Sequence, residues 1–254
     1  MRTFVIAEPG CTHEGSFEAM TKLVKVAADA GCDAYKSQWM SDPQKVCERR
    51  DAPEYLTFYR WLAYPLHWHT HLKALCESLG MEYGCTTYLP EDREAIDEYV
   101  DFHKVASFEN YAFGSREGKP VIIGAGMLTH EELSRLVATA PPHWRILQCT
   151  SSYPTPIESV NLATIRQYRL AGLSDHSSDV EMGALAVCAG AKIIETHMRL
   201  QDCDPANPDY AVALNPTELD LYVDGIRDAE KAMGYPLKQI LPCEQAMTRF
   251  KVQA

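Results

Sequence analysis

The feature that most constrains this fold is an alternation, repeated along the chain, between a short apolar run and a helical stretch. Each apolar run is rich in β-branched residues and ends in a polar residue, which is typical of a buried parallel strand. These runs occupy residues 4–10, 33–38, 81–87, 101–107, 120–126, 145–151, 170–176 and 192–198. The clearest helical patterns cover 17–31, 66–79, 90–99, 130–139, 180–190 and 216–233. The alternation predicts an α/β protein.

The number of repeats favours a closed barrel. Eight β-α units in 254 residues match a (β/α)8 TIM barrel, although the alternation alone leaves a doubly wound open sheet as the alternative. The polar strand ends favour the barrel, because a barrel gathers them around one mouth. Segments 108–119 and 156–169 are too short for full crossover helices, so we expect the outer helices to be somewhat trimmed. No linker interrupts residues 1–254, which predicts a single domain.

Composition argues against several classes of protein and partner. No apolar run approaches the ~18 residues of a membrane span, and the first run is too short for a secretory signal. Nine cysteines without C-x-x-C spacing predict reduced thiols, so we expect a cytoplasmic protein. The net charge of −11 argues against nucleic acid and anionic membranes as partners, but a few lysines in one pocket can still bind a small anion.

Two histidines follow consecutive strands of the predicted barrel. His176 lies in "LSDHSS" and His197 in "IIETHM", at the ends of strands 7 and 8. Imidazoles at equal height on neighbouring strands can share one divalent cation, with water or substrate at the open positions. The alternative is a pair of structural histidines that bond to nearby carboxylates. Asp175 points to the opposite face of its strand, so we expect it to orient its neighbours or a helix.

Two lysines end strands 2 and 4 and face the same mouth. Lys36 and Lys104, with the hydroxyls of Ser107 and Ser174, can form a phosphate or carboxylate pocket. A Schiff-base lysine and a structural pair bridged to strand-end carboxylates are the alternatives. The carboxylates that could bridge the lysines, or serve in metal ligation or proton transfer, are Glu8 and Glu109.

Ordered motifs through nearly the whole chain carry a resemblance to a known family. They are "IAEPGCTHEGSF", "AGCDAYKSQ", "GMEYGCTTY", "HKVASFE", "GKPVIIGAGM", "CTSSYPTPIESVNL", "GLSDHSSD", "AGAKIIETHM", "NPDYAVALNPTEL" and "GIRDAEKAMG". By these motifs the chain resembles the N-acetylneuraminate (sialic acid) synthase family, whose members are phosphoenolpyruvate-condensing barrel enzymes.

The resemblance implies a metal-dependent transferase. Phosphoenolpyruvate would condense with the aldehyde of an N-acyl-hexosamine such as N-acetylmannosamine, giving a 2-keto-3-deoxy sugar acid and phosphate. The implied metal is Mn²⁺ or Mg²⁺, held by His176 and His197, with catalytic roles also for Glu8 and Glu109. The implied substrate-binding residues are Lys36, Gln38, Lys104, Ser107, Ser151, Tyr153, Ser174 and Asp209.

The sequence also departs from the family pattern. Members commonly continue into a C-terminal antifreeze-like domain that supplies an arginine to the sugar in a dimer. We expect no such domain in residues 1–254 and no matching arginine, and both a homodimer and a monomer stay open. Gly124 stands where the family usually has a phosphate-binding serine. Two other functions therefore stay open: a non-catalytic phosphometabolite-binding barrel and a Schiff-base aldolase.

Overall fold

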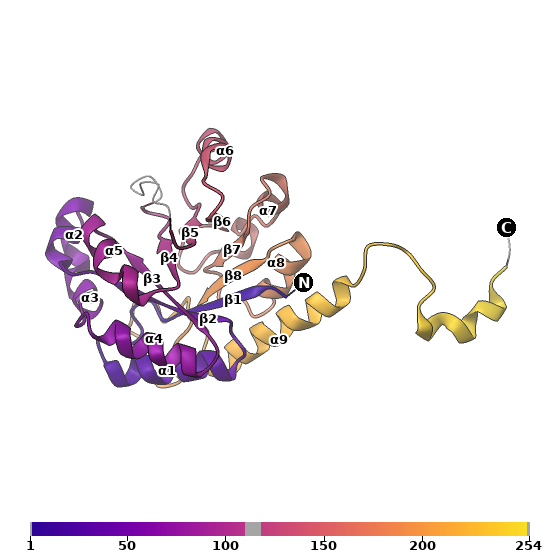
Figure 1. The fold of residues 1–254 in the computed structure, drawn as a ribbon, viewed down its shortest axis with the longest axis horizontal. Helices are drawn as coiled ribbons and strands as arrows, with labels where there is room; N and C mark the ends of the chain where they lie inside the picture. Colours follow the sequence, from indigo (N-terminus) through magenta and orange to yellow (C-terminus); the bar gives the residue numbers. More distant parts are fainter. Residues whose placement is uncertain (1, 110–117, 253–254) are drawn as a thin grey trace.

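Eight parallel strands form a closed barrel, in the order in which they follow along the chain (Figure 1). The structure is a computed structural model that describes residues 2–109 and 118–252. The strands are β1 (Phe4–Glu8), β2 (Ala34–Trp39), β3 (Glu82–Thr87), β4 (Phe102–Val105), β5 (Val121–Gly124), β6 (Trp144–Cys149), β7 (Gly172–Asp175) and β8 (Ile193–His197). Because β8 pairs with β1, the sheet is closed and the predicted barrel is confirmed.

The predicted helices lie on the outside of the barrel. They are α1 (Phe17–Asp29), α4 (Trp68–Ser78), α5 (Pro90–Ile96), α6 (His130–Thr139), α8 (Met182–Ala189) and α9 (Pro216–Met233). The start of α9 shows why these sequences form helices. The Asn215 side chain accepts from the Glu218 amide at 3.0 Å, while the Glu218 carboxylate accepts from the Asn215 amide at 2.8 Å. This capping box satisfies two backbone donors, and Pro216 suits the first helical position.

The outer layer is reduced after β6, as expected. There the crossover contains only a short turn of 3₁₀ helix, η3 (Ile157–Ser159), and the five-residue helix α7 (Ala163–Gln167). The other segment expected to lack a full helix, 108–119, includes residues 110–117, which lie outside the described residues.

Two helices between β2 and α4 are not predicted from the sequence. These are α2 (Pro43–Arg50) and α3 (Leu56–Trp61), joined by η1 (Pro53–Tyr55). Asp42 caps α2 by accepting from the Lys45 amide at 3.0 Å. A small core that includes Val46 and Leu62 packs this pair against Cys11 and Tyr88, which follow β1 and β3. Because these residues follow the carboxyl ends of their strands, α2 and α3 lie over the barrel mouth.

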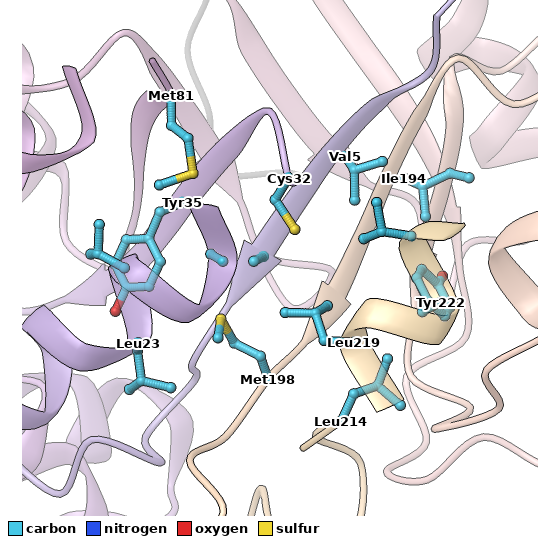
Figure 2. Close-up of a cluster of buried hydrophobic side chains, with 14 of the residues drawn as sticks. Val5, Leu23, Cys32, Tyr35, Met81, Ile194, Met198, Leu214, Leu219 and Tyr222 are labelled. Atoms are coloured by element: carbon cyan, nitrogen blue, oxygen red, sulfur yellow. The ribbon is translucent and has the colours of Figure 1, made fainter. Parts of the chain in front are cut away.

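The main core lies between the barrel and its outer helices (Figure 2). Val5 and Ile194 come from the neighbouring strands β1 and β8, Leu23 from α1, and Leu219 and Tyr222 from α9. Each fully buried aliphatic side chain of this kind contributes about 1.5–3 kcal/mol. This packing holds the strands in register, so the side chains at their carboxyl ends stay at fixed heights.

The chain leaves the barrel after α9 and ends in the 3₁₀ helix η4 (Pro242–Phe250), which lies apart from it (Figure 1). Within the described ranges, no helix combines the length and the apolar character that crossing a bilayer requires.

Candidate active site

The ladder register places the functional side chains of neighbouring strands side by side. Glu8 of β1 pairs with His197 of β8, and Ser174 of β7 pairs with Glu195 of β8. These residues line a cavity of about 860 Å³ at the mouth. All of the predicted site residues line this cavity except Ser151. The Ser151 hydroxyl instead donates to Ser107 Oγ at 2.7 Å, which places it behind a residue of the lining.

Two lysines and two carboxylates form a buried cluster at the bottom of the cavity. Lys36 Nζ lies 2.7 Å from Glu8 Oε2 and 3.4 Å from Glu195 Oε1, and it donates to Thr86 Oγ1 at 2.7 Å. Lys104 Nζ lies 3.3 Å from Glu195 Oε2. The cluster is formally neutral, and none of its four charged side chains is more than 5% exposed. Its charges therefore interact strongly.

These neighbours favour the charged forms of Lys36 and Glu195. Burial opposes the charge on Lys36, but Glu8 and Glu195 outweigh it and raise the pKa of the ammonium above its ordinary value. Burial likewise opposes the charge on Glu195, but Lys104 and Lys36 hold the pKa of this carboxyl well below its usual range. A lysine must lose its proton to form a Schiff base, so the raised pKa makes Lys36 a poor candidate for that role.

The alternative in which Glu8 and Glu109 bridge the lysines does not hold for Glu109. Glu8 does pair with Lys36, but the second carboxylate of the cluster is Glu195. Glu109 accepts instead from Arg49 and from Arg50, the latter at 2.7 Å. The physical reason is its position, because Glu109 follows β4 by several residues and lies at the level of α2.

The hydroxyls predicted to bind phosphate have partners within the site. Ser174 Oγ donates to Glu195 Oε2 at 2.6 Å, so it stabilises the carboxylate between the lysines. Gly124 faces Lys104 and Ser107, since a Cβ built there would lie 3.2 Å from Lys104 Nζ and 3.4 Å from the Ser107 amide nitrogen. The place of the missing serine side chain is therefore next to a cationic group and a backbone N–H.

The two predicted metal ligands lie together. The His176 and His197 rings are 5.3 Å apart between centroids, and the Tyr153 ring packs 4.3 Å from that of His176. His176 Nδ1 lies 3.0 Å from the Thr150 carbonyl, which can only accept. Nδ1 therefore donates, and a neutral His176 ring keeps a lone pair on Nε2.

The donor set fits a divalent cation held at an open site. His197 Nδ1 is buried without a hydrogen-bond partner in the described structure, and His197 Nε2 lies 3.9 Å from Glu8 Oε2. Residues 2–109 and 118–252 contain no cluster of three or more His, Cys, Asp or Glu side chains arranged for a metal. The chain would thus supply His176 and His197, and water or substrate would supply the remaining ligands.

Gly10 leaves room for the Asp209 carboxylate and for the His197 ring. Gly10 has a φ of +54°, and a Cβ there would lie 2.2 Å from Asp209 Oδ2 and 3.2 Å from His197 Nδ1. Asp209 Oδ2 also accepts from the Cys11 amide at 2.7 Å. A side chain at position 10 would therefore be strained and would displace Asp209.

Asp175 faces away from the cavity, as expected from its place between Ser174 and His176. Its carboxylate accepts from the Tyr222 hydroxyl on α9 and from the Ser177 amide, both at 2.8 Å. Burial raises the pKa of Asp175. It fixes the strand end against a helix and does not line the cavity.

An outer chamber forms the upper half of the cavity. We use this name for the lining contributed by α2, η1, α3 and the loops after β3 and β4: Arg49, Arg50, Ala52, Tyr55, Phe58, Tyr59, Leu62, Tyr88, Ala106, Phe108 and Glu109. Gln38 connects it to the bottom of the cavity, because its amide nitrogen donates to Glu8 while its carbonyl oxygen accepts from the Tyr88 hydroxyl.

Sequence reasoning places Glu195 at a strand end but gives it no role, and it does not single out Arg49 or Arg50. Glu195 has a usable signal, since it precedes His197 by two residues and must share its face of β8. The sequence signal for the arginines is weaker. The "DP" at 42–43 marks only the start of a helix, and a short helix from there would end at Arg49 and Arg50.

Comparisons with known proteins find a matching family and similar curated proteins. The model of a family described as "NeuB family" matches residues 23–238. The N-acetylneuraminate-9-phosphate synthase of Homo sapiens is 29% identical over 96% of this chain and 74% of that protein. The pseudaminic acid synthase of Campylobacter jejuni is 31% identical over 92% of this chain and 75% of that protein.

A solved structure supports the fold. The crystal structure of N-acetylneuraminic acid (sialic acid) synthetase from Leptospira borgpetersenii, in complex with citrate, superimposes with a TM-score of 0.86 at 24% identity. The match covers 98% of this chain and 91% of that one.

Proposed function

The chain belongs to the NeuB family, and from this membership and the cavity described above we propose that it is a phosphoenolpyruvate-condensing sugar-acid synthase. The proposed reaction joins phosphoenolpyruvate to the open-chain aldehyde of an N-acyl-hexosamine such as N-acetylmannosamine. The products are a 2-keto-3-deoxy sugar acid and inorganic phosphate. The relatives named for sialic and pseudaminic acid synthesis support an acceptor of this class.

The buried lysines are the observation that carries the proposal. Phosphoenolpyruvate bears a phosphate and a carboxylate, and Lys36 and Lys104 present two ammonium groups at the bottom of one cavity. Strong anion binding follows when the anion takes over some of the contacts that Glu8 and Glu195 make with these lysines. Such an exchange leaves Glu8 and Glu195 with fewer cationic partners, so the loaded site needs a further positive charge.

The chemistry needs one new carbon–carbon bond and one broken carbon–oxygen bond. The methylene carbon of phosphoenolpyruvate attacks the aldehyde carbon, water adds at the second carbon, and phosphate leaves from that carbon. The water gives up two protons in all: one goes to the aldehyde oxygen, and the other leaves with the phosphate when the hydroxyl at the second carbon becomes the keto group. Glu8 lies beside Lys36 and can take up the first proton that water loses and pass it to the aldehyde oxygen, while Gln38 donates to the Glu8 carboxylate and holds it in place.

Charge balance supports a divalent cation at His176 and His197. The lysine–carboxylate cluster is formally neutral, so an incoming phosphoenolpyruvate anion leaves the site negative unless a cation joins it. A bound Mn²⁺ or Mg²⁺ would supply Lewis-acid polarisation of the aldehyde oxygen. The contact between His176 Nδ1 and the Thr150 carbonyl orients one ring for this role.

Phosphate release is the direct test of the reaction. The protein is incubated with phosphoenolpyruvate, Mn²⁺ and a panel of N-acyl-hexosamines, and inorganic phosphate and the 2-keto acid are measured. We expect release that requires both an acceptor and the metal. His176→Ala and His197→Ala should lower the rate by at least about 10-fold, whereas His67→Ala, at an exposed site before α4, should not.

Two results would contradict the proposal in different ways. If phosphoenolpyruvate binds in calorimetry but no acceptor gives turnover, the chain is a non-catalytic phosphometabolite-binding barrel. If chelation leaves activity intact and borohydride traps a pyruvate adduct, the chain is a Schiff-base aldolase that uses Lys104 or Lys36.

We also propose a cytoplasmic location, where the nine cysteines, all free in the structure, would stay reduced. A homodimer is proposed by analogy with the family, and sedimentation of the purified chain would test it.

A further inference from the structure

Arg50 is fixed among aromatic rings at the rim of the cavity. Its guanidinium lies 4.8 Å from the centroid of Tyr88, 5.5 Å from that of Phe108 and 5.8 Å from that of Tyr59. It donates to the Tyr59 hydroxyl and to Glu109 Oε1, each at 2.7 Å. The Arg50 side chain is 20% exposed and therefore partly screened from water.

Arg49 lies beside it on the same carboxylate. It donates to Glu109 Oε2, and its side chain is 37% exposed, so it borders both the cavity and solvent. Glu109 takes one N–H from each arginine, and Tyr59 takes another from Arg50. Each guanidinium carries more N–H donors than these bonds use, in a planar fork that matches phosphate or carboxylate oxygens.

The charges of the outer chamber do not cancel. Two arginines and one carboxylate give it a formal charge of +1, because its other lining residues in the described part of the chain are uncharged. The lysine–carboxylate cluster below it is formally neutral, and the whole chain carries −11. A positive chamber in an acidic protein is best matched by an anionic ligand group.

The outer chamber is connected to the reacting centre. The Tyr88 ring under Arg50 carries the hydroxyl that donates to Gln38, and Gln38 in turn donates to Glu8. An acceptor whose aldehyde lies near Glu8 would therefore extend along Gln38 and Tyr88 toward the arginines. The aromatic rings can pack against its carbon chain.

We propose that Arg49 and Arg50 form a subsite for an anionic group, a phosphate monoester or a carboxylate, at the end of the acceptor remote from its aldehyde. The proposal rests on the proposed function and names the acceptor class of that same site. Arg49 binds the anion from the rim. Arg50 holds Glu109 in place. Because the single carboxylate of Glu109 neutralises only one of the two arginines, one positive charge remains for the anion.

Three acceptors that differ only at the sixth carbon test this proposal. They are N-acetylmannosamine, its 6-phosphate and the corresponding uronic acid, which present a hydroxyl, a phosphate and a carboxylate. We expect kcat/KM for at least one anionic acceptor to exceed that for the neutral sugar by about 10-fold or more. The anionic acceptor with the higher kcat/KM shows whether the subsite prefers a phosphate or a carboxylate.

The variants separate binding of the anion from structural support. Arg49→Gln should lower kcat/KM for the preferred anionic acceptor about 10-fold, mainly through KM, and alter the neutral sugar less than about 2-fold. Arg49→Lys should recover part of the loss. The matched control is Lys45→Gln, which removes one positive charge from the same helix but pairs outside the cavity, with Glu91.

The outcomes distinguish the subsite from the reaction. Turnover of the neutral sugar at least as fast as both anions, or an equal loss for every acceptor in Arg49→Gln, overturns the subsite and leaves the synthase intact. If no acceptor is turned over, the proposed function fails, and calorimetric binding of the three sugars still decides the subsite. Equal affinities there overturn it.

Discussion

Replacing Glu195 by glutamine, which has nearly the same size and shape, should still destabilise the protein because it removes a buried charge. The substitution keeps an acceptor for Ser174 but removes the one carboxylate that lies within ion-pair distance of Lys104 in the described structure. Lys36 is less affected, because Glu8 remains 2.7 Å away. The variant therefore contains one buried ammonium group, 5% exposed, without a counter-ion.

The magnitude follows from the distance and the burial. At 3.3 Å the Lys104–Glu195 attraction is about 5 kcal/mol for an effective dielectric constant near 20, and removing one partner of a buried pair typically costs about 3–5 kcal/mol. We expect Glu195→Gln to lose about 3 kcal/mol in urea unfolding and roughly 6–12 °C in Tm. Glu91→Gln, which breaks an ion pair that is over half exposed, should lose less than about 1 kcal/mol.

The same variant should respond more strongly to anions. Inorganic phosphate would supply the missing counter-charge, so saturating phosphate should raise the Tm of Glu195→Gln more than that of the parent. Adding Lys104→Met should restore part of the lost stability and abolish the extra response. The reasoning is refuted if Glu195→Gln unfolds within about 1 kcal/mol of the parent, or if phosphate stabilises both proteins equally.

Two further perturbations address the fold and the anion pocket. Burial lowers the pKa of His69 from 6.5 to about 4, so its contribution to stability is full above pH 6.5 and is lost as the pH falls toward 4. Between pH 7 and pH 5 the free energy of unfolding of the parent should therefore fall by about 2 kcal/mol on account of His69, and urea unfolding of His69→Gln should lack this part of the fall. His67→Gln, at an exposed position, serves as the control. Gly124→Ser should lower the Kd for phosphoenolpyruvate several-fold in calorimetry, because its hydroxyl would lie near Lys104 Nζ and the Ser107 amide. Gly124→Ala adds only the Cβ, and equal affinity of the two variants would show that the hydroxyl makes no bond.

The barrel and the lower half of the cavity could be predicted from sequence for a physical reason. In a parallel barrel every strand ends at the same mouth, so a polar residue at a strand end is placed by the topology alone. Lys36, Lys104, His176 and His197 meet in this way. Ser151 shows the limit of the rule, because past the end of β6 the backbone turns and its hydroxyl points to Ser107.

The outer chamber could not be predicted in the same way. The segment that holds Arg49 and Arg50 is rich in charge and has no apolar period, so its helix is stabilised by the Asp42 cap and by contacts with distant residues. Glu109 was considered as a bridge between the lysines, yet its partners come from this unpredicted helix. Local pattern fixes where a strand ends, but tertiary packing decides what reaches over it.

The two halves of the cavity therefore differ in how their charges are arranged. At the bottom, the carboxylates of the adjacent strands β8 and β1 pair with the lysines of β2 and β4, and this cancellation keeps a buried cluster stable before any substrate arrives. At the rim, a helix outside the strand pattern adds two arginines to one carboxylate and leaves a positive excess. The rim is partly solvated, so it can carry that excess at small cost. The outer chamber is linked to the buried cluster through the hydrogen bonds from Tyr88 to Gln38 and from Gln38 to Glu8. A substitution in the α2–α3 segment that leaves these two bonds intact should therefore alter which acceptor binds without disturbing the buried cluster.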